Sequence, residues 1–211
     1  MNHLSTPSKM PVPTFDLPID KTGCVDRCLY GQSKKCTVTK NPNERYPSRK
    51  ALVLRNWELI NSKKFESEIT AQIRKKRIND FRWFSSGDFF SLESIDKVIK
   101  VCKNLSRIRH WIATSRDDLL KEWLKDNSIP ENVNIRLSAP VPNMEIPQFM
   151  IDEFSPFGVT FSETTTDPHK ANCHASISTE KGINCGDCDL CWKKDHKITK
   201  YYLKGVKNEI S

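Results

Sequence analysis

The middle of the chain alternates between helix-like and strand-like hydrophobic patterns, and this alternation limits the fold more than any other feature. Strands that alternate with helices form parallel βαβ units joined by right-handed crossovers. A chain of 211 residues leaves room for about five or six such strands, which excludes a complete eightfold barrel. The sequence therefore predicts an α/β fold, either an open sheet or a partial (βα) barrel. We expect helices over 47–76, 91–105, 116–127 and 146–154, and strands over 80–90, 107–115, 132–138 and 157–163.

Local signals fix some of these boundaries. Pro47 suits the first turn of a helix, and the helix that starts there is expected to break near residues 61–62. Ser91 is the expected N-cap of the following helix. The apolar stripe of that helix includes Cys102, so we interpret this cysteine as a small buried side chain.

Several predicted strands end in small polar residues. Parallel α/β proteins bind ligands at the carboxyl edge of the sheet, so these residues could form the floor of a ligand site. The alternative is that they only cap the helices that follow. The candidates for contact with a cofactor are Ser86, Gly87, Asp88, Ser115 and Ser138, and the candidates for catalysis are Asp88 and Arg116.

Seven of the eight cysteines lie in two groups near the ends of the chain. The N-terminus lacks the apolar core of a signal peptide, and no apolar run approaches the roughly 20 residues of a membrane span. We therefore expect a soluble, cytosolic protein, in which reduced thiols favour metal binding over disulfides. The N-terminal group is Cys24, Cys28 and Cys36, and the C-terminal group is Cys173, Cys185, Cys188 and Cys191.

The C-terminal group has the spacing C-x11-C-x2-C-x2-C. Two cysteines separated by two residues can chelate one zinc ion, whereas three in succession wrap the backbone around a larger centre, as in ferredoxin-type iron–sulfur sites. Gly186 lets the chain pass close to such a centre. Because four thiolates can also hold zinc, the spacing favours an iron–sulfur cluster but leaves zinc open.

The N-terminal group has the spacing C-x3-C-x7-C. Three thiolates can hold three irons of a four-iron cluster and leave the fourth iron free to bind a substrate or cofactor. The alternative is a zinc or structural site that a distant histidine or cysteine completes.

The formal net charge of +8 favours an anionic partner, such as nucleic acid, a phosphorylated small molecule or an anionic cluster. Basic runs such as residues 74–77 also have a simpler interpretation, because cations near a helix C-terminus complement the helix dipole.

The N-terminal cysteines, placed ahead of a predicted partial barrel, resemble the radical S-adenosylmethionine (SAM) superfamily, whose motif is C-x3-C-x-aromatic-C. Cys24, Cys28 and Tyr30 match this motif, but Gly31 stands at the third cysteine and Cys36 comes five residues later. The resemblance implies SAM as a cofactor and a radical that abstracts hydrogen from a substrate. The superfamily's glycine-rich turn and acidic residue, which contact the cofactor, would be Gly87 and Asp88.

Most of the chain is similar to the bacteriophage gene product 88 family. The shared elements are an N-terminal C-x3-C-(L/Y), an R-x-x-x-SGDFFS segment, a T-(K/S/R) strand end and a C-terminal C-x2-C-x-LCW. A cysteine–proline element that members carry upstream of the first pair is missing, and Cys36 is its candidate substitute. The family implies a phage protein in the cytoplasm of a bacterial host and specifies no reaction. The four elements correspond to residues 24–30, 82–91, 114–116 and 185–192.

The sequence predicts a flexible segment over residues 1–20 and a single α/β domain over 21–211. Within the domain we expect an N-terminal cysteine loop (21–46), a βα core (47–165) and a cysteine-rich metal-binding segment (166–205). The favoured function is an iron–sulfur protein with one or two 4Fe-4S clusters on a radical-SAM-like scaffold, and the sequence leaves open whether it is a redox or SAM-dependent enzyme. One alternative is a non-catalytic zinc or cluster protein that binds nucleic acid, and another is an electron-transfer or redox-sensing unit.

Overall fold

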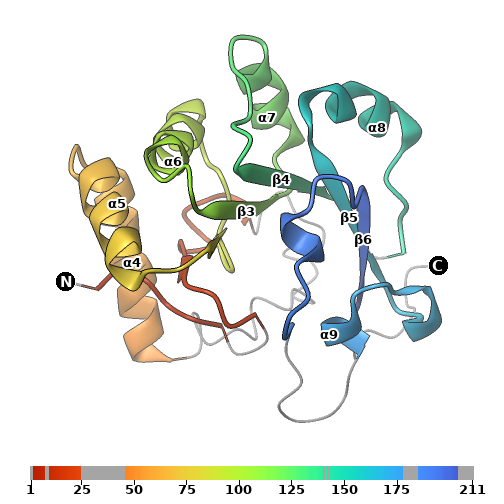
Figure 1. Cartoon of the computed structure of the whole chain (residues 1–211), viewed down its shortest axis with the longest axis horizontal. Coiled ribbons are helices and arrows are strands. Elements are labelled where there is room, and N and C mark those ends of the chain that lie inside the picture. Colours follow the sequence, from red (N-terminus) through yellow and green to blue (C-terminus); the bar gives the residue numbers. More distant parts are fainter. Residues whose placement is uncertain are drawn as a thin grey trace.

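The computed structural model describes residues 2–7, 10–24, 46–139, 141, 143–177 and 185–203. In these residues, six strands form one all-parallel sheet with the spatial order β1-β2-β3-β4-β5-β6, which is also their order in the sequence (Figure 1). The sheet is open, with β1 and β6 at its edges. The strands are β1 (Thr14–Phe15), β2 (Asp80–Trp83), β3 (Arg109–Thr114), β4 (Val133–Ser138), β5 (Thr160–Thr165) and β6 (Ile198–Tyr202).

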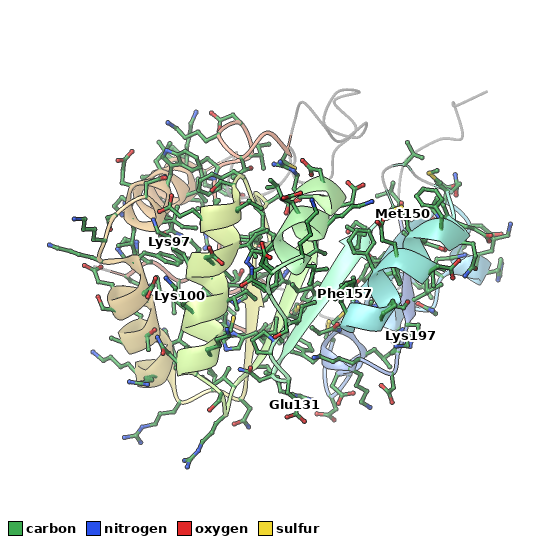
Figure 2. The ribbon with its side chains drawn as sticks, turned by 90° about the horizontal axis from the view of Figure 1, so that it is seen from above. Lys97, Lys100, Glu131, Met150, Phe157 and Lys197 are labelled. Carbon is green, nitrogen blue, oxygen red and sulfur yellow. The ribbon has the colours of Figure 1, made fainter. Side chains whose placement is uncertain are left out.

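The main helices connect successive strands and cover one face of the sheet. Because every crossover between neighbouring parallel strands has the same hand, a sequential strand order places these helices on the same side. They stand side by side when viewed from above (Figure 2). The helices are α4 (Pro47–Ile60), α5 (Phe65–Lys76), α6 (Leu92–Asn104), α7 (Asp117–Leu124) and α8 (Gln148–Phe154).

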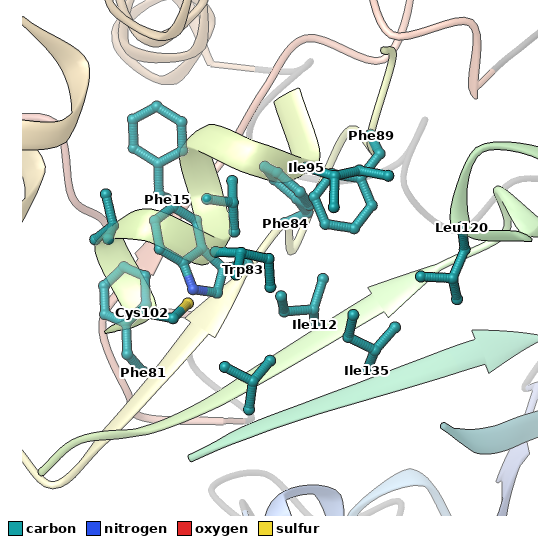
Figure 3. Close-up of a cluster of buried hydrophobic side chains, with 14 of the residues drawn as sticks. Phe15, Phe81, Trp83, Phe84, Phe89, Ile95, Cys102, Ile112, Leu120 and Ile135 are labelled. Carbon is teal, nitrogen blue, oxygen red and sulfur yellow. The ribbon is translucent and has the colours of Figure 1, made fainter. Parts of the chain in front are cut away.

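The main hydrophobic core lies between the sheet and these helices (Figure 3). Alternate residues of each strand point to it; Phe81 and Trp83 of β2 are fully buried there, whereas Arg82 between them points to the other face. Each large side chain buried in this way stabilises the fold by about 1.5–3 kcal/mol. Cys102 is buried in the same core, as predicted.

The other face of the sheet is lined by polar side chains, and we call it the inner face. The register places Arg82 of β2, Trp111 of β3 and Asn134 of β4 side by side on it. The next inward residue of β4 is Arg136. A small cluster of Met10, Trp111, Cys191 and Trp192 packs separately from the main core. Figure 1 shows the N-terminal stretch and the C-terminal segment on this side, away from the helices.

The structure agrees with the predicted α/β class and parallel sheet, and an open sheet of six sequential strands is compatible with a partial barrel. The predicted helix break is confirmed between α4 and α5, and Ser91 caps α6 with a reciprocal capping box. The strand predicted over 80–90 is shorter and ends at Trp83, because Phe84 adopts a left-handed backbone with φ of 57°.

Two strands were not predicted. The sequence suggests a flexible segment over residues 1–20, whereas Thr14–Phe15 forms β1 and Phe15 and Leu17 are completely buried. The second, β6, lies within the predicted cysteine-rich segment. In the part of the chain that the structure describes, no helix has the length and apolar character needed to cross a membrane.

Candidate metal centre

The four C-terminal cysteines lie on two segments that precede β6 in the sequence and contact it in the fold. Cys173 precedes the short helix α9 (His174–Ile177), and its backbone N–H donates to the carbonyl of Lys200 in β6. Cys185 and Cys188 share a tight turn, in which the Cys188 N–H donates to the Cys185 carbonyl over 2.8 Å. Cys191 lies in the 3-10 helix η3 (Leu190–Trp192). The segments therefore meet near β6 although they are separated in sequence.

Residues of the inner face fix η3 against the sheet. The Asn134 side-chain amide donates to the carbonyls of Cys191 and Lys193 over 2.8 and 3.2 Å, and Thr160 donates its hydroxyl to Asn134 Oδ1. The Trp192 ring packs on Trp111 with centroids 6.0 Å apart. These contacts hold the Cys191 backbone over the middle strands.

The four thiols are close enough for their charges to influence the pKa of Cys185. Burial, followed by the charges of Cys191, Cys173 and Cys188, raises the pKa of Cys185 to about 11, while Arg82 acts in the opposite direction. Burial also raises the pKa of Cys191; the Tyr201 hydroxyl, 3.5 Å from its Sγ, and the guanidiniums of Arg136 and Arg82 act in the opposite direction. The apolar surroundings therefore favour neutral thiols, and the nearby cations favour thiolates.

Among the described residues, no three His, Cys, Asp or Glu side chains are grouped closely enough to hold one metal ion as they stand. A single tetrahedral ion requires its sulfur ligands to converge on one point about 2.3 Å from each. An iron–sulfur cluster binds its cysteines at several separate irons and so requires less convergence.

Two arginines lie on the inner face beside these thiols. Arg136 is completely buried, and Arg82 is mostly buried with its guanidinium 4.6 Å from the centre of the Trp111 ring. Burial lowers the pKa of both guanidiniums; Asp16 and the thiols of Cys191 and Cys185 partly offset this for Arg82. Buried cations of this kind require negative charge nearby.

Several buried N–H donors on or near this face have no acceptor among the described residues. Tryptophan Nε1 and arginine Nε can only donate, so an unpaired one needs an acceptor. Thiolates and inorganic sulfides are such acceptors, and soft thiolate ligands select zinc or iron–sulfur centres. The residues present therefore fit an anionic, thiolate-ligated centre. The unpaired donors in this region are Arg82 Nε, Trp111 Nε1, Arg136 Nε and Trp192 Nε1; His196 Nε2 is also unpaired, and its role depends on the tautomer.

Of the three cysteines of the predicted N-terminal centre, the structure describes Cys24 alone. Cys24 is partly buried and follows a turn in which the Thr22 hydroxyl donates to the carbonyls of Pro18 and Ile19. Cys28 and Cys36 lie outside the described residues. A metal site on these three cysteines stays a prediction.

Asp88 joins the turn after β2 to the end of β3. Its carboxylate accepts hydrogen bonds from the Thr114 hydroxyl, from the Ser115 N–H and hydroxyl, and from the Phe89 N–H, at 2.6–2.9 Å. Burial raises the pKa of Asp88, while these hydrogen bonds oppose the rise. Since an ionised carboxylate offers about four lone-pair sites, these bonds occupy its acceptor capacity.

Other candidate residues at the carboxyl edge of the sheet also contact neighbouring residues of the protein. Ser86 donates its hydroxyl to the Leu17 carbonyl, and Gly87 lies against the same residue. Arg116 forms a two-point ion pair with Asp118 and donates to the Phe89 carbonyl. These contacts explain the local structure, and the predicted roles in cofactor binding and catalysis stay predictions.

Ser138 is placed differently from the other edge candidates. It lies on the inner face, two residues after Arg136, with its hydroxyl 3.1 Å from the hydroxyl of Ser162. The structure therefore brings one of the predicted edge residues onto the same face as the C-terminal cysteine segment. Its predicted contact with a cofactor stays a prediction.

Sequence reasoning missed several polar residues of the inner face. Asp16 accepts hydrogen bonds from Ser5, Thr14 and the 85–86 turn. Arg136 and Tyr201 were not predicted as site residues. A signal for Arg136 exists, because "VNIRLS" alternates apolar residues with Asn134, Arg136 and Ser138, the pattern of a strand with one polar face.

The chain matches a known protein family. The family model described as Gene product 88 matches residues 7–194. The chain belongs to this family. The match includes both cysteine groups and all six site candidates at the carboxyl edge of the sheet, so the gene product 88 assignment covers nearly all of the architecture described above. No curated protein and no solved structure matches the chain.

Proposed function

We propose that this gene product 88 protein is an iron–sulfur protein, in which Cys173, Cys185, Cys188 and Cys191 hold a 4Fe-4S cluster on the inner face for use in a redox reaction. The observation that carries the proposal is that these thiols influence one another and that one of them, Cys191, lies beside Arg136, a fully buried cation that has no carboxylate partner among the described residues. A thiolate-ligated cluster would supply the missing negative charge and acceptors.

Such a cluster supplies one-electron transfer, and the chain supplies ligands and a shielded environment. Cys191 is buried against Met10, Trp111 and Trp192, which exclude water from one side. The turn at Cys185 and Cys188 is partly exposed, so an electron donor or acceptor could approach there.

A SAM-dependent reaction is the more specific form of the proposal. It would need a second cluster on Cys24, Cys28 and Cys36, and its support is the resemblance of Cys24, Cys28 and Tyr30 to the radical-SAM motif. The test is to mix reduced, iron-loaded protein with SAM and to assay 5′-deoxyadenosine. Its formation supports this form, and its absence limits the proposal to electron transfer.

The alternative of nucleic-acid binding rests on the net charge. Four of the five tryptophans are buried and do not offer stacking surfaces. On the helix-covered side, Lys97 and Lys100 of α6 (Figure 2) are paired with Glu93 and Glu66. Binding of a labelled single strand that weakens steeply between about 50 and 200 mM salt would favour this alternative.

The deciding experiment is to count iron and sulfide in anaerobically purified protein. About four irons per chain and a broad absorption band support one cluster, and about eight support two. Cys188→Ser should lose one cluster's iron, about four per chain, because it removes a ligand. Cys102→Ala, the matched control, should keep all its iron because Cys102 lies in the helix-side core.

Two results would overturn the proposal. Colourless protein that contains zinc would assign the cysteines to a zinc site. An iron count that Cys188→Ser leaves unchanged would show that this cysteine is not a ligand.

A further inference from the structure

The Arg136 guanidinium has four of its five N–H groups satisfied by neutral acceptors. Nη1 donates to the Phe161 carbonyl at 2.9 Å and to the Thr199 hydroxyl. Nη2 donates to the carbonyls of Leu190 and His196 at 3.2 and 3.4 Å. The fifth donor, Nε, has no partner among the described residues. The bonds to Leu190 and His196 place the guanidinium directly beneath the cysteine segment.

The positive charge of Arg136 is also without a carboxylate partner in the described part of the chain. The groups that raise its pKa against the effect of burial are Tyr201 and Cys191. Tyr201 in turn contacts the Cys191 sulfur. A fully buried cation surrounded by carbonyls and hydroxyls is unfavourable unless an anion lies close to it. Cys191 is the neighbouring group that would become such an anion, because a cysteine binds a metal centre as a thiolate.

Other unpaired N–H donors also lie around Cys191. Trp111 and Trp192 are in contact with each other and with Cys191, and each has a buried ring N–H without an acceptor. Arg82 lies on the face of Trp111 and is influenced by Cys185 and Cys191. Cations and N–H donors therefore surround the buried side of the thiol group, while carboxylates are absent from the described contacts of Arg136.

We infer that Arg136 is a positioning residue for the C-terminal centre: its charge and its free Nε–H stabilise the ligand sulfurs and raise the reduction potential. The inference rests on the proposed iron–sulfur function. In a one-electron reduction, the SO2 radical anion that dithionite releases would pass its electron to the centre and become sulfite; the centre beside the guanidinium would then be one charge unit more negative, and no bond between the chain and the centre would form or break. A nearby cation favours this more negative state, and hydrogen bonds to the sulfurs act in the same direction.

The experiment is a redox titration of iron-loaded protein followed by visible absorption, with iron and sulfide counted in every sample. Arg136→Gln should keep its iron but need a more negative potential, with the reduced-to-oxidised ratio at a fixed potential falling about tenfold, which is about 59 mV for one electron. Arg136→Lys keeps the charge and should recover most of this shift. Arg74→Gln removes the same charge from the exposed surface of α5 and should leave the potential unchanged.

The outcomes separate the inference from the proposed function. If wild-type protein contains no iron and sulfide, both the proposed function and the inference about Arg136 are overturned. Iron-loaded Arg136→Gln with the wild-type potential overturns the inference alone, as does an equal shift in Arg136→Gln and Arg136→Lys. If Arg136→Gln does not fold, Arg136→Met decides, because it removes the charge and the N–H groups but keeps an unbranched side chain and buries no unpaired amide; a more negative potential supports the inference and an unchanged potential overturns it.

Discussion

At the scale of single residues, Gly87 shows how the SGDFFS segment is fixed by its backbone. Its φ is +78°, and a Cβ at this position would lie 2.7 Å from the Leu17 Cβ and 2.8 Å from the Leu17 carbonyl oxygen. Leu17 is also hydrogen-bonded to the residue before Gly87: its N–H donates to the Ser86 carbonyl, and the Ser86 hydroxyl donates to the Leu17 carbonyl. A side chain here would therefore push β1 away from the turn that follows β2.

We predict that Gly87→Ala lowers the free energy of unfolding by about 2–4 kcal/mol, because left-handed strain and a backbone clash add together. Urea denaturation measures the loss. Gly158→Ala is the matched control, since Gly158 has nearly the same φ of +77° but no atom within 4 Å of the added Cβ. Its loss should be only about 1–2 kcal/mol. Equal losses at the two positions would show that contact with Leu17 is unimportant.

The residues that could be predicted are those whose chemistry is visible in a local pattern. Cys102 was assigned to the core from the apolar stripe of its helix, and Ser91 to the N-cap from its position. Gly87 and Asp88 were identified as special, but the reason for their placement depends on Leu17 and Thr114, which lie far away in sequence. Long-range contacts of this kind leave no mark in the local sequence.

At the scale of elements, η3 depends on β4 for its position. The amide nitrogen of Asn134 donates to the carbonyls of Cys191 and Lys193, and its oxygen accepts from Thr160. Asn134→Asp keeps the size and the acceptor but places a carboxylate oxygen against two carbonyls. We predict that Cys191 in metal-free protein then reacts with iodoacetamide about tenfold faster or more, since each buried group left unpaired costs about 1–3 kcal/mol. Mass spectrometry of peptides identifies the modified cysteine.

Asn132→Asp provides the control for this change. Asn132 also donates its amide to backbone carbonyls, those of Cys102, Leu105 and Ile108, but it fixes the connection between α6 and β3. This variant should leave the rate at Cys191 unchanged. Faster reaction of Cys191 in both variants, to the same degree, would indicate general loosening and contradict a specific role for Asn134.

The strands that sequence reasoning missed are the two at the edges of the sheet. β1 has only two residues, and its polar, proline-containing surroundings give no periodic signal. β6, "ITKYY", is short and lies within the predicted cysteine-rich segment, which was interpreted by its ligands alone. The inner strands were predictable because helices cover one of their faces and impose a strong apolar pattern.

At the scale of the whole molecule, the sheet separates two regions of different composition. The helix-side core contains most of the large apolar residues, whereas the inner-face cluster is small and includes Cys191 with the partly buried Cys185. Regions that bury few apolar side chains open with lower free energy than the main core. A metal centre on the inner face would therefore stabilise its own side of the sheet more than the helical side.

We predict that removal of iron with a chelator accelerates hydrogen exchange in residues 173–177 and 185–203 by about tenfold or more, since ligation couples to local folding. Exchange in α5, α6 and β2 should stay the same, because their side chains pack in the helix-side core. Mass spectrometry of peptides measures both regions, and iron-loaded Cys102→Ala should behave as the loaded wild type. Uniform acceleration that includes α6 would mean that the metal centre stabilises the whole fold, and unchanged exchange in 185–203 would mean that this segment holds no metal.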